Sequence, residues 1–215
     1  NKIFNKIMNY KREHYIDMKK LKTIPLGISG RHVHLSQKTL DILFGVSNYQ
    51  LTLFKNLKQK GQFAATEKID IMSPSGKILT GVRILGPVRN LDQVELSQSD
   101  CLRYQFQAFV RSSGDIRNSG KATLIGPKGQ LEITEGVIIA DRHIHFSTDE
   151  AKMFNIKDKQ IVNIKIKGIK SGILGNVLCR VHESFVLECH LDTDDASAFL
   201  LKTGEEVEML HNLIV

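Results

Sequence analysis

The sequence contains the pattern Arg-His-x-His-x-Ser twice, at residues 31–36 and at residues 142–147. Residues two apart on a β-strand point to the same face. Each copy therefore directs two imidazoles to one side of its strand and the intervening Val or Ile to the other. Two converging imidazoles are the beginning of a transition-metal site. The repeat predicts a duplicated unit with a metal in each half.

A second pair of matching segments supplies a third ligand for each half. Residues 93–100 align with residues 188–195, and this alignment places Glu95 on His190. Both residue types bind metals, and both positions lie in predicted strands. We therefore expect two centres, one formed by His32, His34 and Glu95 and the other by His143, His145 and His190.

These ligand sets indicate catalytic rather than structural metals. Two histidines with a glutamate, or three histidines, are typical of catalytic zinc, which keeps a fourth position open for water or substrate. Counting ligand charges alone, a divalent cation would leave about +1 at the first centre and about +2 at the second. Both centres would attract oxyanions, and a metal there could polarise a carbonyl, bind phosphate oxygens or stabilise a leaving thiolate.

Two loops offer further groups for an anion. The Gly-Pro-Val-Arg segment that ends at Arg89 places a guanidinium after a predicted strand and shortly before Glu95. Residues 111–115 (Arg-Ser-Ser-Gly-Asp) combine hydroxyl groups, a flexible backbone and a cation, which suits phosphate. Taken singly, Arg89 is equally explained by a surface salt bridge and the loop by an ordinary turn. Their combination with two predicted cations favours an anionic substrate.

The elements that must position these residues are mainly short strands rich in Ile, Val and Leu. Gly-containing and Pro-containing turn pairs separate them, a pattern typical of a β-sandwich or β-barrel. The predicted strands are residues 24–28, 68–72, 82–85, 94–96, 122–125, 131–133, 137–140, 161–166, 177–181 and 186–190.

The few predicted helices are short, and two of them follow the His-x-His strands directly. Ser36 is a predicted N-cap for residues 37–44, with Gly45 at the C-terminal end. Ser147 and Glu150 form a capping-box pattern before residues 151–154. Capping therefore explains the serine of each repeat better than catalysis does.

The first 21 residues have the pattern of a separate amphipathic helix, with apolar residues at helical spacing (Ile3, Phe4, Ile7 and Met8). Residues 1–22 carry seven Lys and Arg side chains against two carboxylates, so they hold +5 of the formal net charge of +7. Such a helix could pack on its own domain, dock on a protein partner or touch a membrane surface.

Composition narrows the classes of function. Because the basic charge is concentrated in the first 22 residues and aromatic content is 7% with no Trp, we expect no nucleic-acid partner. No apolar run is long enough to cross a bilayer, and no signal peptide is visible, so we expect no membrane association. Three cysteines without a CxxC pair favour a reducing cytoplasm. The sequence has no P-loop, no dinucleotide-binding fingerprint and no Gly-x-Ser-x-Gly elbow.

The motifs together resemble one known family. Residues 24–36 are similar to the opening segment of the phosphate propanoyltransferases, the Pdu-type phosphotransacylases associated with bacterial microcompartments. The resemblance runs from about residue 24 to about residue 204, and several further motifs occur in the family's order. These are residues 61–65 (Gly-Gln-Phe-Ala-Ala), 85–89 (Leu-Gly-Pro-Val-Arg), 93–95 (Gln-Val-Glu), 111–115 and 135–138 (Glu-Gly-Val-Ile).

The resemblance implies a mainly β fold of two β-barrels capped by short helices. The expected division is residues 1–21 for the N-terminal helix, 22–106 for the first barrel half and 107–215 for the second, with strand exchange between the halves left open. It also implies two zinc ions per chain, held by the six predicted ligands, and coenzyme A as substrate or product. Arg89 would bind phosphate with Ser113 close by, and Ser29, Lys55 and Arg83 would hold coenzyme A.

The implied reaction converts acyl-CoA and inorganic phosphate into acyl phosphate and coenzyme A, typically with a propanoyl group. Residues 1–21 would direct the enzyme to shell or core proteins of a microcompartment in the cytoplasm, and a homo-oligomer stays open. A rival hypothesis is a zinc-dependent hydrolase of a thioester or phosphoester. A third is a double-barrel binding module with structural metals.

Overall fold

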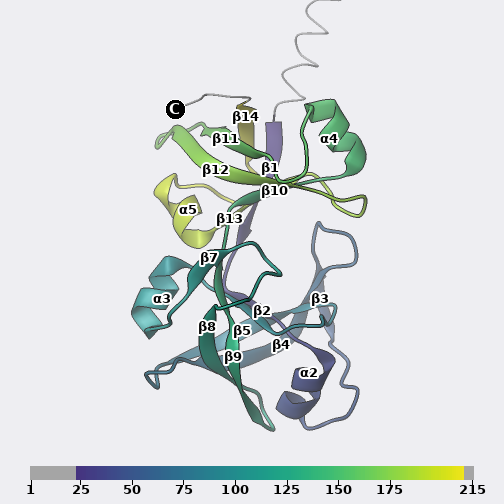
Figure 1. The fold of residues 1–215 in the computed structure, drawn as a ribbon, viewed down its shortest axis with the longest axis vertical. Helices are drawn as coiled ribbons and strands as arrows, with labels where there is room; N and C mark the ends of the chain where they lie inside the picture. The colour runs from purple at the N-terminus through teal and green to yellow at the C-terminus, as the bar shows by residue number, and fades with distance from the viewer. Residues whose placement is uncertain (1–22, 211–215) are drawn as a thin grey trace, which may run out of the picture. The chain divides into compact units, whose positions relative to one another are not determined.

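The computed structural model describes residues 23–210, so the predicted helix at residues 1–21 lies outside the described part. The described chain is mainly β-strand and forms two closed six-stranded barrels with short helices (Figure 1). This confirms the predicted fold class. None of the helices in residues 23–210 is long and apolar enough to span a membrane.

The N-terminal barrel lies in a compact unit made of residues 28–141 and 191–197. The two outer strands β3 (Leu53–Asn56) and β7 (Phe109–Arg111) extend its sheet beyond the closed ring. Around the ring the strands follow the order β4 (Phe63–Met72), β5 (Ile78–Gly86), β2 (His32–His34), β6 (Gln93–Glu95), β9 (Gln130–Ala140) and β8 (Gly120–Ile125), and β8 closes it by pairing with β4.

The C-terminal barrel lies in a second compact unit, whose described residues are 23–27, 142–190 and 198–210. Its ring closes through antiparallel pairing of the first and last strands of the described chain. The strand order is β1 (Thr23–Ser29), β13 (Glu188–Asp192), β10 (His143–Phe146), β12 (Gly172–Val181), β11 (Ile161–Ile166) and β14 (Glu206–Leu210).

The two barrels repeat one strand arrangement. In each, the His-x-His strand pairs in parallel with one neighbour, β2 with β5 and β10 with β12. On its other side it pairs antiparallel with the strand of the third predicted ligand, β2 with β6 and β10 with β13. This equivalence supports the internal duplication expected from the sequence.

The barrels are not two successive stretches of chain. Strand β1 belongs to the C-terminal barrel although it runs directly into β2, and β9 belongs to the N-terminal barrel although it runs directly into β10. The predicted division at residue 106 falls inside the unit of residues 28–141. The C-terminal barrel therefore contains the strand that precedes the N-terminal His-x-His strand. The N-terminal barrel contains the strand that precedes the C-terminal His-x-His strand.

The predicted helix caps after both His-x-His strands are present. Helix α2 (Gln37–Phe44) begins after Ser36, whose side chain accepts a hydrogen bond from the Thr39 amide, and ends at Gly45 with φ of 69°. Helix α4 (Thr148–Phe154) begins with the predicted Ser147–Glu150 capping box. Helices α3 (Gln98–Tyr104) and α5 (Thr193–Ala198) follow the strands of the third ligands. A helix thus follows each strand that carries a predicted metal ligand.

The apolar residue between the two histidines lies in the core of each barrel. Val33 and Ile144 are both completely buried, as the period-two pattern predicts. The same strands therefore turn an apolar face to the core and an imidazole face to the predicted metal.

Replacing Ile144 with alanine is expected to lower the free energy of unfolding by about 2–5 kcal/mol, because it removes a fully buried side chain and leaves a cavity. Urea denaturation measures this loss. Ile161→Ala on β11 is the matched control, since Ile161 is 53% exposed and its loss should change stability by about 0.5 kcal/mol or less. Equal losses for both variants would contradict this placement of the core.

Candidate metal centres and anion pocket

The first predicted ligand set comes together in the N-terminal barrel. Strands β2 and β6 pair antiparallel with His32 opposite Glu95, which places both side chains on the same face as His34. All three residues are buried, and one ligand atom from each lies within 4.8 Å of the others. We call this group the N-terminal cluster.

Hydrogen bonds within the N-terminal cluster set the direction of its rings. The His32 Nδ1 atom lies 2.8 Å from the Gly30 carbonyl oxygen, which makes Nδ1 the donor nitrogen. The His32 Nε2 atom faces the cluster, 3.3 Å from Glu95 Oε2, and His34 Nε2 lies 3.9 Å from Glu95 Oε1. A backbone carbonyl that fixes the far nitrogen of an imidazole is the usual support of a metal-binding histidine.

The surroundings of the N-terminal cluster shift the pKa values of its two imidazoles in opposite directions. Burial lowers the pKa of His34 to about 3, with the nearby His32 and Arg89 acting in the same direction. Burial also opposes a charge on His32, but the Glu95 carboxylate outweighs it and raises the pKa of His32. Burial alone would favour the neutral acid of Glu95, yet His32 and His34 hold its pKa below the usual value. A divalent cation would replace the proton shared by His32 and Glu95.

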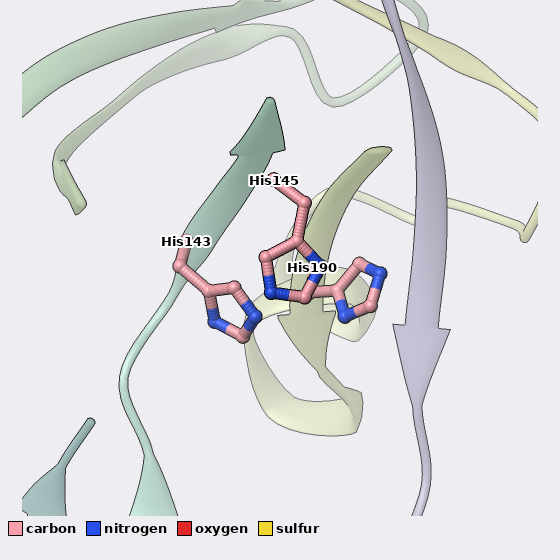
Figure 2. Close-up of side chains that lie close together, drawn as sticks. All are labelled: His143, His145 and His190. Carbon is pink, nitrogen blue, oxygen red and sulfur yellow. The ribbon is translucent and has the colours of Figure 1, made fainter. Parts of the chain in front are cut away.

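The second predicted ligand set comes together in the C-terminal barrel. Figure 2 shows His143 and His145 from β10 and His190 from β13 with their imidazoles gathered at one place. The ring centroids are 4.7 Å, 4.8 Å and 5.0 Å apart, and one ligand atom from each residue lies within 4.8 Å of the others. We call this group the C-terminal cluster.

His145 provides a test of whether the C-terminal cluster suits a metal. Both of its ring nitrogens are buried, and neither has a hydrogen-bond partner within residues 23–210. Burial, followed by the neighbouring His143 and His190, lowers the pKa of His145 to about 2, so its imidazole is neutral. Buried polar atoms without partners are costly in a folded protein. A neutral imidazole is also the form that binds metal, so these donors fit a divalent transition metal.

A pocket adjoins the N-terminal cluster. It is lined by Arg89, Asn90, Leu91, Gln93 and Gly114. The positive charge of Arg89 lies close enough to help lower the pKa of His34 and to oppose in part the rise in the pKa of His32. The structure thus brings the predicted phosphate ligand Arg89 to the predicted metal ligands.

Ser113, which was predicted to lie close to the phosphate, contacts the N-terminal cluster. Its hydroxyl donates to Glu95 Oε1 over 2.9 Å and accepts a hydrogen bond from the side-chain amide of Gln93 over 3.0 Å.

Burial and an adjacent carboxylate raise the pKa of the Cys101 thiol to about 11, and burial raises that of Cys179 to about 12. These two thiols are therefore protonated and unreactive at neutral pH.

The three residues predicted to hold coenzyme A are placed differently from one another. Arg83 on β5 is the register partner of His32, donates to the Ala65 carbonyl and lies 4.5 Å from the centroid of the Phe54 ring. Lys55 follows Phe54 on the exposed strand β3. Ser29 is half-buried at the end of β1. None of the contacts described for residues 23–210 joins Ser29 to the other two.

Three residues at the clusters were given no role there by the sequence analysis, although Gln93 belongs to the Gln-Val-Glu motif. Gln93 bonds to Glu95 and Ser113, Glu188 bonds to His190, and the Phe185 ring stacks on His145 with centroids 4.1 Å apart. Gln93 and Glu188 each stand two residues before a predicted ligand, so the period of two could have indicated them. Phe185 lies in a loop without any periodic pattern, and no sequence signal identifies it.

Comparisons with known proteins agree with this geometry. The family model for phosphate propanoyltransferase matches residues 25–202. A phosphate propanoyltransferase from Thermotoga maritima is 46% identical over 202 residues, which cover 94% of this chain and 95% of the relative. Those from Lachnoclostridium phytofermentans and Priestia megaterium are 41% and 44% identical, with 87% of this chain covered in each case and 87% and 85% of the relatives. Matches of this extent, together with the two barrels and their clusters, show that the chain belongs to the phosphate propanoyltransferase family of acyltransferase enzymes.

Proposed function

We propose that this enzyme interconverts a short-chain acyl-CoA, propanoyl-CoA above all, and inorganic phosphate with the acyl phosphate and coenzyme A. The observation that carries the proposal is the pocket of Arg89 beside the N-terminal cluster. A guanidinium, a buried carboxylate–histidine group and a loop of hydroxyl and amide donors meet there. Such a pocket suits a small oxyanion better than a large neutral substrate.

We propose direct attack of phosphate on the thioester. A phosphate oxygen forms the new bond to the carbonyl carbon, the carbon–sulfur bond breaks, and the thiolate of coenzyme A leaves with the electron pair. The serines of the two repeats give no support to the alternative of a serine nucleophile, because Ser36 and Ser147 cap helices. Arg89 would bind the phosphate and orient it, and such positioning contributes on the order of several kcal/mol.

Each cluster would hold one divalent cation, and zinc is the metal that best suits donor sets of histidine with one carboxylate or of three histidines. The ligands would be His32, His34 and Glu95 in one barrel and His143, His145 and His190 in the other. When bound, the metal supplies Lewis-acid stabilisation of negative charge on oxygen or sulfur. Ser29, Lys55 and Arg83 are proposed contacts of coenzyme A; Arg83 lies over the exposed Phe54 ring, and Lys55 follows Phe54 on β3.

A thiol-release assay with propanoyl-CoA tests the reaction. We expect release of coenzyme A to depend on phosphate and to yield acyl phosphate, detected as the hydroxamate after reaction with hydroxylamine. Chelator-treated protein should lose this activity and regain it with zinc, and elemental analysis should show about two metals per chain. Thiol release at the same rate without phosphate would favour the zinc-dependent hydrolase instead. A stable fold with no activity would favour the binding module with structural metals.

We propose that residues 1–21 bind shell or core proteins of a microcompartment in the cytoplasm. The support is the amphipathic spacing of Ile3, Phe4, Ile7 and Met8 and the +5 charge of residues 1–22. A fluorescent protein carrying residues 1–21 should co-purify with assembled shells, and a variant with Ile3 and Ile7 changed to serine should not. Diffuse fluorescence from the unaltered fusion would contradict the proposal. Homo-oligomerisation stays open and is measured by light scattering.

A further inference from the structure

The two clusters share one more position besides their ligands. In the N-terminal barrel the antiparallel register places Gln93 opposite His34, two residues before Glu95. In the C-terminal barrel the same register places Glu188 opposite His145, two residues before His190. Residues directly opposite on antiparallel strands share a face. Gln93 and Glu188 are therefore equivalent, and each stands beside the third ligand of its cluster.

Gln93 connects the third ligand of the N-terminal cluster to the anion pocket. Its side-chain amide donates to Glu95 Oε1 over 2.6 Å and to Ser113 Oγ over 3.0 Å, while its carbonyl oxygen accepts from the Gly114 amide over 2.7 Å. Gln93 is buried, and both it and Gly114 line the pocket. One side chain thus fixes both a predicted ligand and the loop that carries Ser113.

Glu188 makes the corresponding contact in the C-terminal cluster. Its Oε2 atom lies 2.8 Å from His190 Nε2, so an ionised Glu188 accepts the Nε2 hydrogen and leaves Nδ1 as the nitrogen with which His190 would hold a cation. The carboxylate is closely packed, because a Cβ placed at Gly27 on β1 would lie 3.0 Å from its Cδ and Oε1 atoms. Carboxylate support of a metal-binding histidine fixes its tautomer and increases its basicity.

The two clusters are therefore matched in charge. In the N-terminal cluster the carboxylate is the ligand Glu95 and its support, Gln93, is neutral. In the C-terminal cluster the ligand His190 is neutral and the carboxylate is its support, Glu188. With a divalent cation bound, each cluster together with its support would carry a net charge of about +1. If only the ligands are counted, the net charge would be about +1 in the N-terminal cluster and about +2 in the C-terminal cluster.

We propose that Gln93 and Glu188 are positioning residues, which orient the third ligand of each cluster. In each cluster the third ligand and its positioning residue together supply one carboxylate. This inference rests on the proposed metal centres. Glu188 is expected to hold the His190 tautomer and to raise the metal affinity of the C-terminal cluster. Gln93 is expected to hold Glu95 and the Ser113 loop in one geometry.

The test is metal binding by the full chain, loaded with cobalt(II) for absorption spectroscopy and with zinc for competition against a chromophoric chelator. Glu188→Ala should leave one metal tightly bound, weaken the other by about 10–100-fold and change the cobalt spectrum. Glu188→Gln keeps an acceptor for the His190 hydrogen without the charge. Glu188→Gln should therefore give the cobalt spectrum of the unaltered protein, while its metal affinity stays reduced. Gln93→Leu should weaken the first centre by a similar factor.

Glu183→Gln is the matched control, because Glu183 is an exposed carboxylate in the loop between β12 and β13. It should behave as the unaltered protein in both measurements. Glu188 variants that bind two metals with unchanged affinity and spectrum would overturn this inference and leave the proposed function standing. An unaltered protein that binds no metal would overturn both. Because Glu188→Gln is nearly isosteric, it keeps the test decisive if Glu188→Ala folds poorly.

Discussion

His190→Ala is expected to lower bound metal from about two per chain to about one and to abolish phosphate-dependent acyl transfer. His190 is one of three donors in the C-terminal cluster, and the two imidazoles left on β10 would hold a divalent cation only weakly. Loss of an outer support of a ligand alone costs about 10–100-fold in affinity or activity, so loss of the ligand should cost more. Elemental analysis after exhaustive dialysis, paired with the thiol-release assay, measures both effects.

His182→Ala is the matched control for this substitution. His182 is exposed, its Nδ1 pairs with the Ser184 hydroxyl, and it belongs to neither cluster. The control should bind about two metals and keep full activity. If His190→Ala retained the same metal content as His182→Ala, His190 would not be a ligand.

The local chemistry of the clusters could be predicted from the sequence because it depends on short-range geometry. The period of two on a strand places His32 with His34 and His143 with His145, and it sends Val33 and Ile144 into the core. The N-terminal ends of helices α2 and α4 could be predicted for the same reason, because Ser36 and Ser147 accept hydrogen bonds from backbone amides only three residues away. The prediction of Glu95 and His190 as third ligands needed an alignment of the two halves, and β6 and β13 pair with their His-x-His strands in the same register.

The exchange of strands between the repeats could not be predicted in the same way. Strand β1 has the same apolar pattern whichever barrel it closes, and its pairing with β14 joins residues at opposite ends of the described chain. The pattern also suggested two strands, residues 131–133 and 137–140, where the structure has the single strand β9. Gly136 interrupts the apolar run, but with φ of 134° it continues the strand in a conformation that only glycine adopts readily.

The outer strands β3 and β7 were missed because they have no buried face. All four residues of β3 are exposed, and β7 is exposed at Phe109 and Val110. The alternation that marks a half-buried strand is therefore absent. Phe185 illustrates the same difficulty at the site, because its contact with His145 depends on where a loop folds back.

Arg89→Ala is expected to raise the KM for phosphate by about 100-fold while metal content and the KM for propanoyl-CoA stay close to those of the unaltered enzyme. A guanidinium binds phosphate through two parallel charge-assisted hydrogen bonds, which together are worth about 3 kcal/mol when lost. The backbone at this position should survive the change. The Arg89 amide donates to the Leu35 carbonyl over 2.8 Å and the residue bridges to Ser36, and neither contact uses the side chain.

Two further variants make the Arg89 experiment specific. Arg117→Ala removes a cation that is 85% exposed and pairs with Asp115, so it should leave the KM for phosphate unchanged. Arg89→Lys keeps the charge but not the planar fork and should fall between alanine and arginine. Because Arg89 lowers the pKa of His34, its loss raises that pKa from about 3, which still leaves the imidazole neutral and able to bind metal at neutral pH. If Arg89→Ala lost zinc in proportion to activity, Arg89 would support the metal centre and would not be the phosphate ligand.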